Sequence, residues 1–369
     1  MTQEGRTATN SAASAGPGSP VAASRATFVF IIVTVTLDFL AFGIIAPVLP
    51  NLIIAFEGGN MARASDITGY FGFAWNLMQF LFLPVLGAWS DRFGRRPVIL
   101  ISCLGLGLDY IFMAVAPTLR WLFVGRLISG ITASNVSTAF AYITDITAPA
   151  ERAKSAWHMA NPMGSLTLLR SHPELAGLSV VVFLYYLAHQ ALQNVFVLYT
   201  EYRYGWNTRS VGISLAVVGV CAVIVSGGMV GPYVKKVGER IGLMSGLLWG
   251  VLGFAGFALA SRGWQMLAAI PFIALWGVAG PSVQSLMSQR VDATSQGKLQ
   301  GAINSLRALT GMAGPLLFTQ VFSAAISPTA RIHLPGAPYY LAAGLLTCSL
   351  LMSVVVTRGY AVRSTATTS

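Results

Sequence analysis

The sequence has 369 residues, of which 55% are hydrophobic and only 9% are Asp, Glu, Lys or Arg, and its mean hydropathy is +0.68. Soluble domains carry about 25% charged residues, so this composition excludes an ordinary soluble protein and indicates an integral membrane protein. The formal net charge of +11 is expected of basic loops at a membrane surface and does not indicate a nucleic-acid partner. The sequence also contains no phosphate-binding loop and no nucleophile with an adjacent base, so we do not expect an enzyme.

Residues 1–26 are rich in Ala, Ser, Gly and Thr and predict a disordered tail. About ten apolar stretches follow, each of roughly 20 residues, which is the length that a helix needs to cross the hydrocarbon core of a bilayer. The predicted fold is therefore an all-α polytopic membrane protein. The predicted spans are Phe28–Leu49, Ile67–Leu86, Val98–Ala116, Leu122–Ile143, Gly177–Tyr199, Val211–Val230, Ile241–Leu259, Met266–Leu286, Gly301–Ala324 and Tyr339–Val356.

The distribution of Lys and Arg predicts the orientation of these spans. Short cytoplasmic loops are enriched in Lys and Arg. If the amino terminus lies in the cytoplasm, the outer loops hold only Arg63, Arg120, Arg203, Arg209, Arg262 and Arg331, and most of the other basic residues fall in cytoplasmic segments. We therefore expect both termini, including a carboxy-terminal tail over residues 358–369, on the cytoplasmic side of the membrane.

A charged segment between the second and third spans occurs again later in the chain. The first copy is GAWSDRFGRRP (Gly87–Pro97) and the second, more divergent copy is GPYVKKVGERI (Gly231–Ile241). Repeated helix bundles are typical of transporters, in which two halves rock about a central site. Fewer spans separate the copies than two equal six-helix halves require, so the first half is predicted to lack two helices. We expect a four-helix bundle over residues 27–145, a cytoplasmic linker over 146–175 and a six-helix bundle over 176–357.

Several segments resemble the major facilitator superfamily, and within it the bacterial tetracycline/proton antiporters. Gly87–Pro97 resembles the superfamily motif between helices 2 and 3. The other matching segments are TLDFLAFGIIAPVLP (Thr36–Pro50), LDY (Leu108–Tyr110), GRLISGIT (Gly125–Thr132), YITDITAPAERAK (Tyr142–Lys154), VGISLA (Val211–Ala216), QGKLQGAINSL (Gln296–Leu306) and GPLLFT (Gly314–Thr319). The resemblance implies the fold of that superfamily, and proton-coupled export of a tetracycline-like drug across a bacterial inner membrane by alternating access.

The resemblance also breaks in the middle of the chain. ERAKSAWHMA (Glu151–Ala160) resembles the loop that leads into the family's helix 5, and NPMGSLTLLRSHPELAGL (Asn161–Leu178) resembles the segment that leads into its helix 7. We therefore expect helices 5 and 6 to be absent, with a junction near Ala160. An alternative function follows, namely a shortened membrane protein that does not transport and is either inactive or a binding partner of full-length transporters.

Three charged residues inside the predicted spans are candidates for proton coupling: Asp38, Asp109 and Arg126. Ionised groups are costly in hydrocarbon, so they usually line a cavity and serve function. The third and fourth spans form a hairpin, which places Asp109 and Arg126 at similar depths and predicts that they pair. The alternative is a static ion pair that only holds the helices together.

Polar residues in other spans are candidates for a substrate cavity. Tyr186, His189, Gln190 and Gln193 share one helical face at spacings i, i+3, i+4 and i+7. Single polar residues in other spans extend this set to Asn76, Gln79 and Gln284. The resemblance matches Gln79, Gln190 and Gln284 to glutamines of the antiporter family. The alternative is ordinary interhelical hydrogen bonding.

The charged segment itself is a candidate gate. Its residues are Gly87, Asp91, Arg92, Gly94, Arg95 and Arg96, with Asp145 at the end of the fourth span. The alternative is that the arginines only set the topology. No cofactor is expected, and the alternative that a divalent cation is carried together with the substrate is left open. The expected partners are thus a small-molecule drug, protons and the lipid bilayer.

The sequence also departs from the antiporter pattern. By the resemblance, the buried acid of family helix 9 falls on Gly250, and the histidine of helix 8 falls on Ala222. His189 is the candidate to replace that histidine, with simple packing as its alternative role. Arg307 has no family counterpart, and we expect it either to reach the cytoplasmic surface or to meet an acid in the cavity.

Overall fold

The computed structural model describes residues 25–133, 173–292 and 295–366. The regular structure in these ranges is helical, as predicted. The helices are α1 (Arg25–Phe56), α2 (Met61–Phe93), α3 (Arg95–Val115), α4 (Leu119–Thr132), α8 (Pro173–Tyr204), α9 (Thr208–Ile224), the π-helix η2 (Val225–Met229), α10 (Val230–Val237), α11 (Glu239–Leu259), α12 (Gly263–Trp276), α13 (Ala279–Ser288), α14 (Gln296–Ile326) and α15 (Ala337–Ala366).

Within the described ranges, 9 helical segments are long and apolar enough to cross a membrane. The α9–α10 and α12–α13 pairs each form one such segment. The predicted fourth span, Leu122–Ile143, begins as α4, and its second half lies outside the described residues. The same holds for most of the predicted linker over 146–175, although α8 already begins at Pro173. At the carboxy terminus, α15 extends to Ala366, into the predicted tail.

The two copies of the charged segment have the same backbone geometry. Gly94 joins α2 to α3 with φ 94° and ψ 159°, and Gly238 joins α10 to α11 with φ 81° and ψ 159°. A side chain would strain this conformation, so glycine is required at both junctions. The helices that follow, α3 and α11, are both 21 residues long and both end at an extended alanine, Ala116 and Ala260. The structure therefore confirms the predicted internal repeat.

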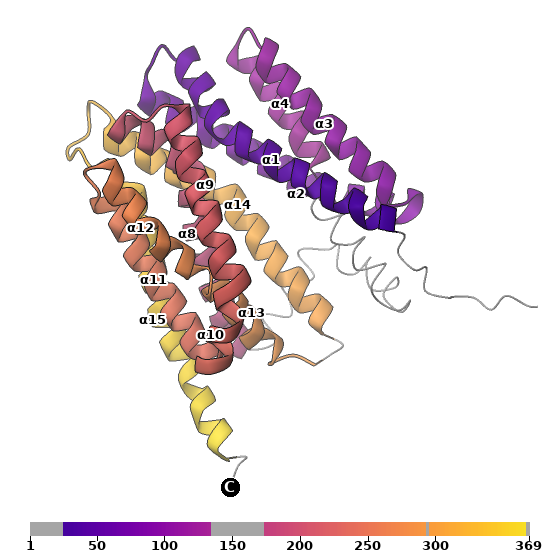
Figure 1. Cartoon of the computed structure of the whole chain (residues 1–369), viewed down its shortest axis with the longest axis vertical. Coiled ribbons are helices and arrows are strands. Elements are labelled where there is room, and N and C mark those ends of the chain that lie inside the picture. The colour runs from indigo at the N-terminus through magenta and orange to yellow at the C-terminus, as the bar shows by residue number, and fades with distance from the viewer. Residues whose placement is uncertain (1–24, 134–172, 293–294, 367–369) are drawn as a thin grey trace, which may run out of the picture.

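The carboxy-terminal half, from α8 to α15, surrounds a large apolar core. Its centre is aromatic, since the ring of Tyr199 lies 4.9 Å from that of Tyr339 and the Tyr199 hydroxyl donates a hydrogen bond to the Phe257 carbonyl at 3.0 Å. The amino-terminal half has a smaller core that includes Ile53 and Leu122. In Figure 1, α1 and α2 lie between the α3–α4 hairpin and the carboxy-terminal half.

The two halves meet where α14 packs along α2. Ser65 donates a hydrogen bond to the Thr319 carbonyl at 2.8 Å. Gly72 allows a close approach, because an added Cβ there would lie 2.8 Å from Pro315 Cβ. Small residues at such a contact let two membrane helices pack closely. We call this contact, from Ser65–Thr319 to Gly72–Pro315, the α2–α14 seam.

The halves meet at one end of the molecule and separate toward the other. Among described residues, the contacts between them run from Asn51 and Thr208, whose side chains are 3.4 Å apart, along the α2–α14 seam to Asn76, which approaches Gly311. In Figure 1 the halves spread apart toward the end where α2 passes into α3 and α10 passes into α11. We call this the junction end and the other the closed end.

The repeat reveals an uncovered helix face. The α9–α10 segment precedes Gly238 as α2 precedes Gly94, and at this spacing Gly69 and Gly72 of α2 correspond to Ile213 and Ala216 of α9. The α2 positions are covered by α14, whereas Ile213 is 56% exposed and Ala216 is exposed as well. A helix that would cover α9 as α14 covers α2 is not among the described elements, as expected for a chain lacking family helices 5 and 6.

The α2–α14 seam yields a stability prediction. Gly72→Ala should lower the melting temperature of the purified protein by about 2–6 °C, because the added Cβ overlaps Pro315. The matched control is Gly107→Ala on α3, where an added Cβ has no atom within 4 Å. Thermal unfolding followed by tryptophan fluorescence distinguishes the two variants. Equal melting temperatures for both would contradict the packing described here.

Candidate functional site

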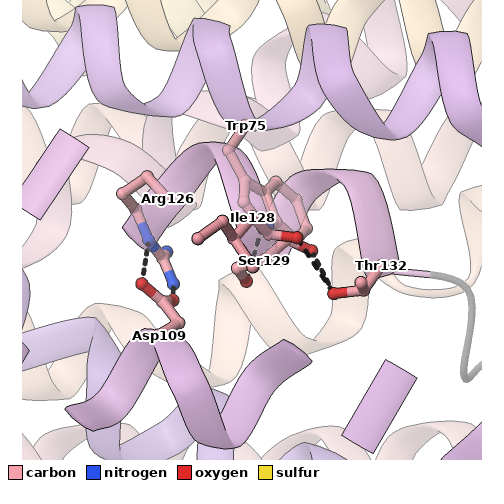
Figure 2. A network of polar contacts seen from close by, with 6 residues as sticks. All are labelled: Trp75, Asp109, Arg126, Ile128, Ser129 and Thr132. Carbon is pink, nitrogen blue, oxygen red and sulfur yellow. Dashed lines mark hydrogen bonds and ion pairs between the residues drawn. The ribbon is translucent and has the colours of Figure 1, made fainter. Parts of the chain in front are cut away.

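The predicted pair of Asp109 and Arg126 is present and buried. Both oxygens of the Asp109 carboxylate face the guanidinium: Arg126 Nε donates to Oδ1 at 3.4 Å, and Nη2 forms an ion pair with Oδ2. Asp109 is completely buried and Arg126 is 9% exposed. Figure 2 shows the pair bridging α3 and α4. A two-point contact of this kind gives a carboxylate–arginine pair its strength and geometry.

Glycines and polar contacts from α2 fix the hairpin that holds this pair. An added Cβ at Gly125 would lie 2.9 Å from Asp109 Oδ1, so glycine makes room for the carboxylate. Further along α4, the Oγ atom of Ser129 accepts a hydrogen bond from Nε1 of Trp75, a residue of α2, at 3.2 Å (Figure 2). Gln79 donates to the Ala133 carbonyl at 3.1 Å. Gln79, predicted to line the cavity, therefore contacts α4.

Asp38, the third predicted proton-coupling residue, lies on α1 beside Tyr110. The two side chains are close enough to interact electrostatically, and Tyr110 directly follows Asp109 in α3. Asp38 is half-buried, whereas Asp109 is fully enclosed. The structure thus places Asp38 beside the residue that follows Asp109 in the chain.

Polar side chains of α2 and α8 meet glycines of α14 at the inner limit of the α2–α14 seam. Asn76 of α2 donates to the Gly72 carbonyl at 2.8 Å and approaches Gly311 of α14. Gln190 of α8 packs on Gly314, and its Oε1 accepts a hydrogen bond from Asn194 at 3.1 Å. Asn76 and Gln190, predicted from separate helices, therefore lie in one region, at the contact between the two halves.

The predicted polar face of α8 contacts two helices, α12 and α14. The Arg307 guanidinium lies over the Tyr186 ring, 5.6 Å from its centre. The His189 ring lies 5.5 Å from that of Trp276 inside the carboxy-terminal half. Gln193 is exposed. Arg307 also lies close enough to His189 to interact with it electrostatically, so Tyr186 and His189 share Arg307 as a neighbour.

A polar edge on α14 extends from this region toward the junction end. Gln300, Asn304 and Arg307 are exposed at spacings i, i+4 and i+7. Gln300 accepts a hydrogen bond from Gln284 of α13 at 2.8 Å and donates to Asn304 at 3.5 Å. Sequence reasoning did not include Gln300, Asn304 or Asn194, although the helical spacing on α14 is a visible signal. We call Gln300, Asn304 and Arg307 the α14 polar edge.

The predicted gate is partly described. Asp91 and Arg95 form an ion pair at 2.7 Å across the Gly94 junction, and Arg95 also donates to Ser90 at 3.0 Å. The Arg92 guanidinium lies 5.3 Å from the centre of the Phe93 ring. Gly87 has no atom within 4 Å of an added Cβ. Asp145 lies outside the described residues, so its place in this network stays a prediction.

The two positions that depart from the antiporter pattern have different surroundings. An added Cβ at Gly250 would lie 2.7 Å from both Leu346 and Trp276, which leaves no space for a carboxylate. Ala222 is exposed on α9. Among the described residues, no group of three or more His, Cys, Asp or Glu side chains is placed to hold a metal ion.

Comparison with known proteins places this chain among transporters. The family model described as Major Facilitator Superfamily matches residues 31–167 and 160–315. Tetracycline resistance protein class C of Escherichia coli is 31% identical over 382 residues, covering 86% of this chain and 95% of that protein. Tetracycline resistance protein class G of Vibrio anguillarum is also 31% identical, covering 86% of this chain and 96% of that protein.

These alignments agree with a missing internal segment. The aligned length of 382 exceeds the 369 residues of the whole chain although only 86% of the chain takes part, so the relative contains residues that this chain lacks. The two segments matched by the family model meet at residues 160–167, next to the predicted junction at Ala160.

Solved structures give the same fold. The human organic anion transporter MFSD10 (TETRAN) superposes with a TM-score of 0.62 at 20% identity, covering 88% of this chain and 98% of that one. A D-xylose-proton symporter superposes with a TM-score of 0.62 at 16% identity, covering 88% of this chain and 97% of that one.

The buried ion pair yields a prediction for a double-mutant cycle. Asp109→Ala or Arg126→Ala alone leaves one buried charge without its partner, which costs about 3–5 kcal/mol of folding free energy. The double variant removes both charges and should be destabilised by less than the sum of the single changes, with a coupling of about 0.5–3 kcal/mol. Melting temperatures in detergent provide the measurement. Additive effects would show that the two groups do not interact.

Proposed function

Because this chain belongs to the major facilitator superfamily, we propose that it is a secondary transporter that exports a small amphipathic, tetracycline-like drug in exchange for protons. The names of its relatives, which are tetracycline resistance proteins at 31% identity, support the substrate class. We place the protein in a bacterial inner membrane, with the junction end and both termini in the cytoplasm, in accordance with the distribution of Lys and Arg.

The observation that carries the proposal is the buried pair of Asp109 and Arg126 within a membrane-spanning bundle. A fully enclosed carboxylate is stable as an ion only while its partner is present. Protonation of Asp109 neutralises the carboxylate and weakens its attraction to Arg126, so proton binding changes how α3 is held against α4. Asp38 is less buried and lies on the neighbouring helix α1, so we assign it the exchange of protons with water.

The arrangement of the halves supports transport by alternating access. They meet at the closed end and separate toward the junction end, which corresponds to a state open to the cytoplasm. Drug enters between α2, α8 and α14, where Asn76, Gln79, Tyr186, Gln190 and Gln284 are the proposed contacts. His189 and Gln193 remain part of this proposed set. The halves then rock about the α2–α14 seam, as in other transporters built from repeats. Moving one charge through 100 mV supplies about 2.3 kcal/mol, enough to bias such a cycle.

The Gly94 junction supplies the proposed gate. In the open state Asp91 pairs with Arg95 of its own half. Closing the junction end brings this charged segment toward the other half, where Asp91 and the arginines Arg92, Arg95 and Arg96 exchange partners, with Asp145 included in the network.

A second function is kept as the alternative. Among the described residues, the face of α9 that corresponds to the covered face of α2 is exposed, and glycine occupies position 250, where the resemblance places the coupling acid. On this alternative the chain is a shortened protein that no longer transports and is either inert or binds full-length transporters.

Transport in inside-out vesicles tests proton coupling. Asp109→Asn and Asp38→Asn should each reduce drug uptake and proton release at least tenfold while leaving the protein in the membrane, because neither amide can bind and release a proton. The matched control is Asp66→Asn near the closed end of α2, which should retain uptake. Unchanged uptake in Asp109→Asn would overturn its assignment.

The same vesicles distinguish the two functions. A variant with two helices of a relative inserted at Ala160 is compared with the natural chain. We expect the natural chain to take up drug at a measurable rate that an uncoupler abolishes. Uptake only in the variant with inserted helices would establish the non-transporting alternative.

A further inference from the structure

Arg307 is a cation deep inside a membrane span. It lies on α14 about 16 Å from the first residue of that helix, Gln296, at a rise of about 1.5 Å per residue. The guanidinium lies over the ring of Tyr186 of α8, so the cation is held beside an aromatic side chain of a neighbouring span. Charged groups at this depth are costly and usually face a cavity or a partner.

No carboxylate among the described residues lies within ion-pair distance of Arg307. The position where the resemblance places a buried acid is Gly250, and Leu346 and Trp276 fill the space around it. The ion pairs of the described chain leave Arg307 as a positive charge that no acid balances in the carboxy-terminal half. Its side chain is exposed, and Gly311, one turn further along the same face of α14, approaches Asn76 of α2, so Arg307 lies on the side of α14 that faces the amino-terminal half.

The surroundings of Arg307 fit an aromatic ligand. The Arg307 guanidinium lies over the Tyr186 ring, 5.6 Å from its centre, and Tyr185 and His189 are close enough to interact with it electrostatically. One turn along α14 lies Gly311, beside Asn76. The α14 polar edge leads from the junction end to Arg307, so a polar molecule meets Gln300 and Asn304 on its way.

We propose that Arg307 binds an acidic group of the transported molecule, so that the cavity selects aromatic anions, such as carboxylates, over neutral and cationic compounds. The planar guanidinium pairs with a carboxylate through two parallel hydrogen bonds, which a neutral amide cannot match. Tyr186 and Asn76 then contact the ring system of the ligand. This inference rests on the proposed function, since it specifies the substrate of the same cavity.

Equilibrium binding to the purified full-length chain in nanodiscs tests the inference without requiring transport. The probes are dansylglycine, an aromatic carboxylate, and dansylglycinamide, its neutral amide, with empty nanodiscs as the blank. The natural chain should bind the carboxylate about tenfold more tightly or better, because charge-assisted hydrogen bonds are stronger than neutral ones. Equal affinities for the two probes would overturn the inference.

Variants assign this selectivity to Arg307. Arg307→Gln should lower the affinity for dansylglycine about tenfold and leave that for dansylglycinamide unchanged, whereas Arg307→Lys should retain part of the preference because it keeps the charge. The control is Arg209→Gln, an exposed arginine at the closed end of α9, which should bind as the natural chain does. Melting temperatures establish that each variant is folded.

The outcomes separate the two proposals. Two outcomes for folded Arg307→Gln would contradict a role for Arg307 in recognising an anion. One is an equal loss of affinity for both probes, and the other is full retention of the preference for the carboxylate. Carboxylate-selective binding that depends on Arg307 supports the inference even if the vesicles show no uptake, in which case only the transport function fails.

Discussion

The close packing of α14 on α2 is the contact on which the rest of the structure depends. It joins the two halves through small residues and the hydrogen bond from Ser65 to the Thr319 carbonyl. The corresponding face of α9, which the repeat leads one to expect to be covered in the same way, is exposed at Ile213 and Ala216. Among the described residues, one side of the molecule therefore has a helix seam and the other does not, and we propose that the α2–α14 seam serves as both attachment and pivot.

The cost of charge in hydrocarbon explains how the charged residues inside the two halves differ. In the amino-terminal half, Asp109 and Arg126 neutralise each other in a buried two-point contact. In the carboxy-terminal half, Arg307 stacks on Tyr186 and no described acid pairs with it. We propose that the first arrangement serves to bind and release a proton and the second to hold an anion, with the movement of α2 against α14 coupling the two halves.

Much of this architecture follows from sequence patterns. Glycine at positions 94 and 238 predicted the repeat, because only glycine tolerates the positive φ of those junctions, and the short α3–α4 hairpin predicted that Asp109 meets Arg126. The details of the cavity did not follow. Helical spacing shows which side chains share a face but not which neighbours they meet, so it could not predict the contact of His189 with Trp276. The hydrogen bond from Gln79 to the Ala133 carbonyl at the end of α4 could not be predicted for the same reason. Arg307 was visible in the sequence, but its stacking on Tyr186 depends on how α14 is placed against α8.

The most direct test of the account is a pair of distances measured by electron spin resonance in a variant whose native cysteines are replaced. Spin labels at Phe93 and Lys298, both exposed at the junction end, report on that opening, and labels at Arg63 and Arg209 report on the closed end. If the halves rock about the α2–α14 seam, substrate or a change in pH shortens the first distance and lengthens the second. Two distances that stay constant under all conditions would contradict alternating access and favour the non-transporting protein.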